Sequence, residues 1–207
     1  GLEDLKVNYD MTVRNNKNKV IQFRYGDDSV VTTKCEKQHY NLINMKMEEI
    51  YAHFQMPSSD NLANINFTKK ASSDIASEKT ELANKTKQVI KYMLDNRDKI
   101  IENVFNNNNE SQIYIPVHFE RIIDNIKERL HIKKTFFVDI TPLQTYKLID
   151  NAWWYLENYC KDSKPSALFK IMWTYYLSPT FLLIKNHFNK TGIKLLLEEL
   201  IHNYKKA

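Results

Sequence analysis

Residues 82–105 read LANKTKQVIKYMLDNRDKIIENVF, and this stretch has the clearest helical pattern in the chain. Its apolar residues recur with a period of 3.6, while lysine, aspartate and asparagine occupy the other side. The apolar stripe consists of Leu82, Val89, Ile90, Met93, Leu94, Ile100, Ile101, Val104 and Phe105. The stretch therefore favours a mainly α fold. The asparagine run at 106–109 is expected to end this helix, because asparagine forms turns better than helices.

Further segments on both sides show helical spacing of the same kind. A loose pattern covers residues 40–54, and the polar interval from 57 to about 77 predicts a loop or short helical pieces. Thr141-Pro142 is a helix-start signal, a capping hydroxyl followed by proline at the first helical position. The Ile113–Val117 run predicts an extended segment, and residues 30–33 a short strand. The remaining predicted helices cover residues 119–130, 142–160, 163–177, 181–188 and 193–201, with a turn at 189–192.

Two adjacent tryptophans lie in the helix that follows Thr141. Neighbouring residues of a helix point about 100° apart, so the two rings do not form one stacking platform. The apolar spacing places Trp153 in the core. Trp154 is then partly exposed, and it is our candidate for a contact with a partner protein.

The first 28 residues carry the most specific signal of the chain. They read GLEDLKVNYDMTVRNNKNKVIQFRYGDD. Residues 1–7 suit the last turns of a helix. Two β-branched and aromatic runs, residues 12–14 and 20–23, flank a polar tip at 15–19, which predicts a β-hairpin.

This stretch resembles the largest subunit of multisubunit DNA-dependent RNA polymerases, of the RNA polymerase II type. That family carries a Leu-Glu-Asp, a Tyr-Asp, a Thr-x-Arg-Asn and a Val-Ile-Gln-Phe-x-Tyr-Gly-Glu-Asp run in this order. The same order and spacing occur here as Leu2-Glu3-Asp4, Tyr9-Asp10, Thr12-Val13-Arg14-Asn15 and Val20-Ile21-Gln22-Phe23-Arg24-Tyr25-Gly26-Asp27-Asp28.

The resemblance continues past the middle of the chain. The family has a Leu-Pro-Val-Asn, then Arg-Arg-Ile-Ile-x-Asn, then His-Ile, where this chain has Ile115-Pro116-Val117-His118, Glu120-Arg121-Ile122-Ile123-Asp124-Asn125 and His131-Ile132. The chain departs from the pattern at several positions. His118 replaces an asparagine, Glu120 replaces an arginine, and Thr174, Tyr175 and Tyr176 stand where arginines are usual.

The resemblance implies a mainly α, multi-helix foot domain with a small β-hairpin near the N-terminus. Residues 1–28 would be the cleft-domain segment that follows the bridge helix, and residues 29–207 the foot domain of the shelf module. The chain begins without an initiator Met and in a helical pattern, so we expect it to be a piece of a longer polypeptide. The implied contacts with the cleft or other subunits fall on Arg14, Asn15, Gln22, Arg24, Tyr25 and Asp27.

The implied function is structural support and partner docking in DNA-templated RNA synthesis. The whole enzyme is a nucleotidyltransferase that uses magnesium, but the family's Asp-Phe-Asp-Gly-Asp loop is absent here, so we expect the fragment alone to be inactive and without a cofactor. A glycine-rich phosphate loop is also absent, since glycines stand only at 1, 26 and 192. Expected partners are the other polymerase subunits, including the small subunit shared by nuclear polymerases, and transcription or RNA-processing factors.

Two other functions fit parts of the sequence. The chain could be an autonomous helical protein-interaction module that shares only the N-terminal motif. Tyr25-Gly26-Asp27-Asp28 also spells the metal-binding turn of viral RNA-dependent RNA polymerases, in which paired carboxylates hold magnesium. A palm domain of that kind needs an upstream carboxylate motif, and only 24 residues precede the turn. The acidic residues are better explained as the close of a hairpin.

Charge and cysteine content narrow the surroundings of the protein. The 30 basic residues exceed the 25 acidic ones by little and are scattered, so DNA is expected to be contacted only through the whole complex. Cys35 and Cys160 fit neither a zinc site nor a disulfide framework, which favours a reducing, intracellular compartment. A membrane span is not expected. The abundance of Lys, Asn, Ile and Tyr suggests an AT-rich genome. The resemblance implies a eukaryote or a large DNA virus as the source, with the protein in the nucleus, or in the virion or host cell.

Overall fold

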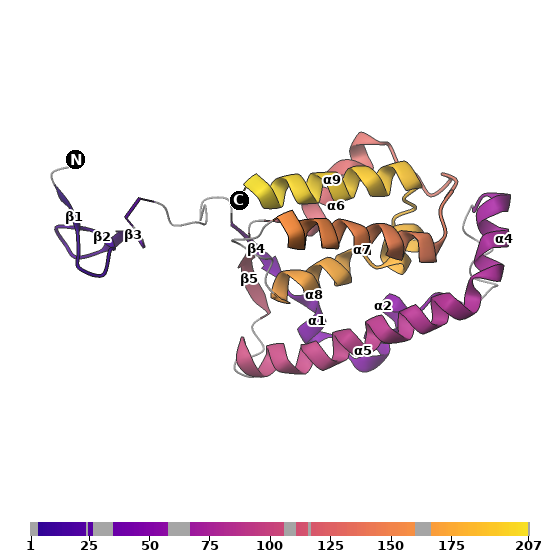
Figure 1. Cartoon of the computed structure of the whole chain (residues 1–207), viewed down its shortest axis with the longest axis horizontal. Helices are drawn as coiled ribbons and strands as arrows, with labels where there is room; N and C mark the ends of the chain where they lie inside the picture. Colours follow the sequence, from indigo (N-terminus) through magenta and orange to yellow (C-terminus); the bar gives the residue numbers. More distant parts are fainter. Residues whose placement is uncertain are drawn as a thin grey trace.

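The computed structural model describes residues 4–23, 25–26, 35–57, 67–105, 111–115, 117–159 and 167–206. In these residues the fold is mainly helical, with two small antiparallel sheets, as the sequence predicts (Figure 1). The strands are β1 (Leu5–Val7), β2 (Val13–Asn15), β3 (Val20–Gln22), β4 (Glu36–His39) and β5 (Gln112–Ile115). The helices are α1 (Asn41–Asn44), α2 (Met47–Phe54), α4 (Lys69–Ser77), α5 (Lys79–Asn103), α6 (Phe119–Arg129), α7 (Pro142–Tyr159), α8 (Ala167–Tyr176), the π-helix η3 (Thr180–Lys185) and α9 (Lys190–Lys206).

The helices pack around one hydrophobic core. The long helix α5 contacts α2, α7 and α8, and α9 contacts α6 and α7, so segments far apart in the sequence share the same interior (Figure 1). Removing their apolar side chains from water is the main favourable contribution to such a fold. The largest fully buried side chains include Trp173, Phe54, Phe119, Phe188 and Met93. The predicted helices over 82–105 and 119–130 are confirmed as α5 and α6.

The N-terminal sheet confirms the predicted hairpin and corrects the segment before it. Strands β2 and β3 pair around the polar tip, with an irregularity of register between Val13 and Arg14. The prediction that residues 1–7 end a helix is wrong for the part that is described, because Leu5–Val7 forms strand β1. In β1, Leu5 pairs with Asn15 and Val7 with Val13. Pairing with β2 satisfies the backbone groups of a segment too short to be a stable helix of its own.

The second sheet joins two segments that sequence periodicity does not connect. The extended segment predicted near 113–117 is confirmed as β5, and it pairs with β4 from Glu36↔Ile115 to His39↔Gln112. The strand expected at 30–33 lies outside the described residues. Strand β4 was missed because Glu-Lys-Gln-His is a polar run with low strand propensity.

The described parts of the region from 40 to 77, residues 40–57 and 67–77, are more helical than their polar composition suggests. The loose pattern over 40–54 becomes the short helices α1 and α2. Part of the polar interval forms α4, which begins at a conventional cap, since the Thr68 hydroxyl accepts a hydrogen bond from the Ala71 N–H at 3.3 Å. The Thr68 N–H donates in turn to the carbonyl of Val138, which anchors the start of α4 to the segment before α7.

The C-terminal helices follow the predicted order with shifted boundaries. Thr141 caps α7, accepting from the Gln144 N–H at 3.2 Å, as Thr-Pro predicts. The helix predicted at 181–188 is a π-helix over Thr180–Lys185. The turn predicted at 189–192 is instead the start of α9, where Gly192 lies in the first turn. A methyl group at Gly192 would approach Phe188 Cδ1 to 2.9 Å, so close packing requires this glycine.

Candidate interaction surface

The polar candidates of the N-terminal sheet hold the hairpin in shape. The guanidinium of Arg14 pairs with the Asp10 carboxylate at 3.0 Å and donates to the Thr12 hydroxyl. Thr12 donates from its hydroxyl and its N–H to Asp10, and these bonds, with Arg14, hold the pKa of Asp10 below its ordinary value. Asn15 Oδ1 accepts from the N–H groups of Lys17 and Lys19, which closes the tip of the hairpin.

The remaining candidates of this sheet are distributed differently. Gln22 is half-buried and pairs with Val13 across the ladder. The Tyr25 ring is exposed, while its N–H donates to the carbonyl of Met11 at 2.8 Å. Arg24 and Asp27 lie outside the described residues, as does Asp28. Arg14 and Asn15 therefore bond to nearby residues of the hairpin and not to each other, whereas the Tyr25 ring is exposed to solvent.

Large apolar side chains are exposed throughout the same sheet and its turns. These side chains lie on both faces of the sheet, because Val7 is in register with Val13 and Gln22, and Ile21 alternates with Gln22 along β3. Here the exposed fraction ranges from 48% at Val7 to 72% at Phe23, and Tyr9 is fully exposed. The exposed set is Val7, Tyr9, Met11, Ile21, Phe23 and Tyr25. We call it the β-sheet patch.

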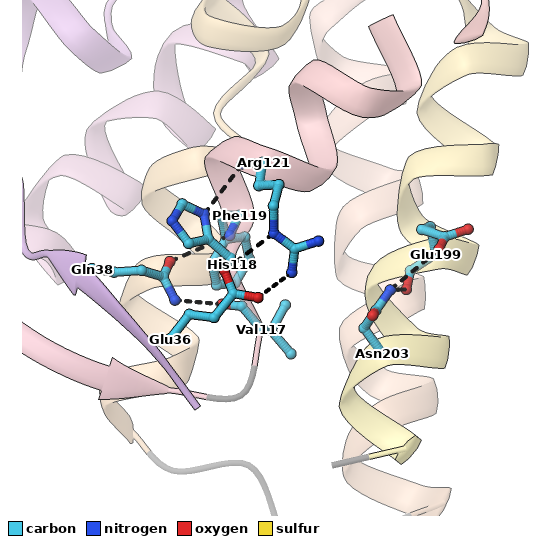
Figure 2. A network of polar contacts seen from close by, with 8 residues as sticks. All are labelled: Glu36, Gln38, Val117, His118, Phe119, Arg121, Glu199 and Asn203. Atoms are coloured by element: carbon cyan, nitrogen blue, oxygen red, sulfur yellow. Dashed lines mark hydrogen bonds and ion pairs between the residues drawn. The ribbon is translucent and has the colours of Figure 1, made fainter. Parts of the chain in front are cut away.

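A polar network joins β4 to the first turn of α6 (Figure 2). Gln38, which is 4% exposed, donates from Nε2 to the Val117 carbonyl at 2.8 Å and accepts the Phe119 N–H at Oε1. The Arg121 guanidinium forms a two-pronged ion pair with Glu36. His118 Nδ1 accepts the Arg121 N–H at 3.2 Å, so this histidine caps α6 where the family has asparagine.

Two other departures from the family pattern contact each other. The Tyr176 hydroxyl on α8 donates to the Glu120 carboxylate on α6 at 3.1 Å. Burial raises the pKa of Tyr176, with Glu120 adding to the shift, so the hydroxyl stays protonated as a donor. The Tyr176 ring also stacks on Phe119, with centroids 5.3 Å apart. The tyrosine thus fixes α8 against the start of α6.

A buried histidine connects α2 to the end of α8. The His53 side chain is 4% exposed, and its Nε2 lies 2.8 Å from the Tyr175 carbonyl and 3.2 Å from the Ser178 hydroxyl. A carbonyl only accepts, so Nε2 carries the hydrogen of the neutral ring. Burial lowers the pKa of His53 to about 4. His53 is therefore a core histidine that joins α2 to the end of α8.

Trp154 lies on the exposed side of α7, as predicted. It is 67% exposed, while Trp153 is 7% exposed and packs edge-on against Trp173. Next to Trp154, the half-exposed Tyr155 accepts a hydrogen bond from Lys205 Nζ at 3.0 Å. Figure 1 shows α7 and α9, which carry these residues, side by side. Trp154 is therefore available to a partner, whereas the neighbouring tyrosine is engaged with α9.

A groove of about 1150 Å³ lies along α5, beside the C-terminal end of α2 and one side of α4. Apolar side chains of α5, among them Leu82, Ile90 and Leu94, contribute to its floor, together with Ile75 of α4. The burial that periodicity predicts is confirmed for Leu82 and Ile90, which are buried, and Leu94 is half-buried against the core. The sequence contains one feature that points to the groove. Ala83 lies on the same side of α5 as Lys79 and Lys87, four residues away in each direction, and a small residue there leaves space between the lysines.

Among the residues that the structure describes, no group of three or more His, Cys, Asp or Glu side chains is placed to hold a metal ion. Within the same residues, none of the helices combines the length and apolar character that crossing a membrane requires.

Comparison with known protein families assigns the helical region. A family model described as RNA polymerase Rpb1, domain 6, matches residues 30–207, which is more than half of the chain. The match covers β4, β5 and every described helix, and it leaves the N-terminal sheet outside. The chain belongs to the RNA polymerase Rpb1 domain 6 family, and so to the largest subunit of a DNA-directed RNA polymerase.

Proposed function

We propose that this chain is a structural and partner-docking segment of the largest polymerase subunit, with the catalytic magnesium held by other segments. In this proposal, residues 1–28 form the cleft-domain segment that follows the bridge helix, and residues 29–207 form the foot domain. Family membership carries the proposal, because it places the chain in a nucleotidyltransferase complex with several subunits. Its partners are then those subunits, together with transcription or RNA-processing factors.

The β-sheet patch supports a docking role for the N-terminal segment. Six large apolar side chains are exposed within a sheet of three short strands. Covering such side chains stabilises an interface by roughly 25 cal/mol per Å² of apolar surface removed from water. Meanwhile Arg14, Asp10 and Asn15 keep the hairpin in one shape through bonds within the sheet. Exposed apolar side chains on a sheet that is held in one shape support contact with other polymerase subunits.

Assembly of the polymerase tests this proposal. In the complete largest subunit, the double substitution Ile21→Ser and Phe23→Ser should reduce co-purification of the other subunits several-fold. Lys17→Ser at the exposed hairpin tip is the matched control and should assemble normally. Equal assembly of the two variants would contradict docking through this sheet.

The assignment of catalysis to other segments has its own test. The purified chain, given a primed template, nucleoside triphosphates and magnesium, should extend no primer. Extension above that of a heat-denatured sample would contradict the proposal. Magnesium binding that depends on Asp27 and Asp28 in a calorimetric titration would favour the RNA-dependent polymerase palm instead.

A further inference from the structure

We propose that the groove along α5 binds an amphipathic helix of a partner protein whose flanks are acidic. The proposal rests on the proposed function and deepens it, since it assigns a partner chemistry to one face of the foot. It stands on three features of the groove: its size, the shape of its floor and the charge of its rim.

The size of the groove favours a macromolecular ligand. Its volume of about 1150 Å³ exceeds the range of roughly 300–1,000 Å³ that is usual for small-molecule pockets. The α5 residues that line it run from Lys79 to Asp95. That distance is about 24 Å at 1.5 Å per residue, which matches a partner helix of about 16 residues.

The floor of the groove allows a helix to approach closely. Ala76 and Ala83 are exposed and lie on the groove side of α4 and α5. Small residues at such positions leave room for the side chains of a second helix to enter between the ridges. Around them, half-buried Ile75 and Leu94 supply an apolar surface for the i, i+3, i+4 and i+7 side chains of an amphipathic helix, while Leu82 and Ile90 form the buried base of the groove.

The rim of the groove selects the charge of the partner. Lys79, Lys87 and Lys91 are exposed and line the same side of α5, against one acid, Asp95. Their spacing of eight and four residues places them on one stripe of the helix. An acidic flank on the partner would complement this stripe, and a basic flank would be repelled.

The test uses the full chain and two synthetic peptides as probes. Each is a 16-residue peptide cross-linked into a helix, with leucine at i, i+3, i+4 and i+7 repeats. One carries glutamate beside the leucines, and the other carries lysine. Fluorescence polarisation should show the glutamate peptide binding at least about tenfold more tightly than the lysine peptide, with the difference shrinking at high salt.

Matched variants locate the binding. Lys87→Glu with Lys91→Glu should remove the preference for the glutamate peptide, and Ala83→Arg should weaken both peptides by blocking the floor. Lys99→Glu is the control, because Lys99 is exposed on α5 and lies outside the groove. Equal affinity for the two peptides, or full binding by the Ala83→Arg variant, would overturn the proposal.

Other occupants of the groove are distinguished in the same assays. If the glutamate peptide binds only after residues 58–66 are replaced by a Gly-Ser linker, residues 58–66 themselves occupy the groove in the intact chain. A dimer that Ala83→Arg dissociates would make it a second copy. Either result overturns the proposal. If the two peptides bind equally but the Ile21→Ser, Phe23→Ser variant still fails to assemble, only the groove proposal is contradicted. If that variant assembles normally, only the proposed docking function of the N-terminal sheet is contradicted.

Discussion

The hydroxyl of Tyr176 donates a hydrogen bond of 3.1 Å to the carboxylate of Glu120, so two departures from the family pattern form one contact. The family has arginine in the region of both residues. Here a carboxylate on α6 meets a neutral donor on α8, and the ring of the tyrosine fills the space beside Phe119. The hydrogen bond and the ring stack together hold α8 against the first turn of α6 in this chain.

The first prediction concerns the strength of this contact. Tyr176→Phe keeps the stack on Phe119 and removes only the hydroxyl, so it should cost about 1 kcal/mol of unfolding free energy. Glu120→Ala should cost a similar amount, and the double variant less than the sum of the two. Chemical denaturation of the four proteins in a double-mutant cycle measures the coupling. Strict additivity would show that the hydrogen bond does not stabilise the fold.

The second prediction concerns pH. The pKa of His53 is about 4 in the folded chain, against an ordinary value of 6.5. As pH falls from 6.5 to 4, the unfolded chain binds a proton that the folded chain does not, so the free energy of unfolding decreases. The contribution of this group is complete above pH 6.5, and about 3 kcal/mol of it is lost by pH 4, at 1.36 kcal/mol per pKa unit.

Substitution separates His53 from the other histidines. His53→Leu should cost about 1–3 kcal/mol at pH 8, because the Tyr175 carbonyl loses its donor, and it should flatten the decline between pH 6.5 and 4. His202→Leu, at an exposed position of α9, is the control and should keep the decline. An unchanged pH profile in the His53 variant would contradict the assignment.

The third prediction compares the two tryptophans of α7. Trp153→Ala removes a buried ring and should cost about 3–5 kcal/mol. Trp154→Ala removes a ring that is 67% exposed and should cost much less. Urea denaturation of the two variants checks the difference. Equal small losses would contradict the orientation of α7 in the core.

The fourth prediction compares two polar residues of β4 (Figure 2). Gln38→Leu leaves the Val117 carbonyl and the Phe119 N–H without their partner, so it should cost about 1–3 kcal/mol. Glu36→Gln breaks an ion pair whose two side chains are more than one-third exposed, and such pairs contribute about 0–1 kcal/mol. Thermal unfolding of both variants measures the contrast. A larger loss at Glu36 than at Gln38 would reverse the account of this network.

Sequence periodicity predicted the helices whose buried apolar residues recur at a regular spacing along the sequence. Helices α5, α6 and α7 were found because their apolar stripes are long, and Trp153 and Trp154 were assigned correctly by the angle between adjacent helical residues. Strand β4 was missed because it pairs with β5, more than 70 residues away, through polar side chains. Local propensity carries no information about such a partner.

The candidate surfaces were predicted less completely than the fold. Arg14 and Asn15 were identified from the family motif, but their local bonds depend on the turns at 8–12 and 15–19, which composition alone does not specify. The groove along α5 was missed for another reason. Leu82 and Ile90 are core residues, as their spacing predicts, and a groove above them depends on how α2 and α4 pack beside α5, which the periodicity of α5 does not specify.

The most direct test of the central claim is to sequence the gene on both sides of the region that encodes this chain. Membership of a polymerase largest subunit predicts an Asp-Phe-Asp-Gly-Asp loop and a bridge-helix sequence upstream, and a trigger-loop sequence downstream. A reading frame that opens just before Gly1 and closes just after Ala207 would contradict a docking segment within the subunit. It would favour an autonomous helical interaction module instead.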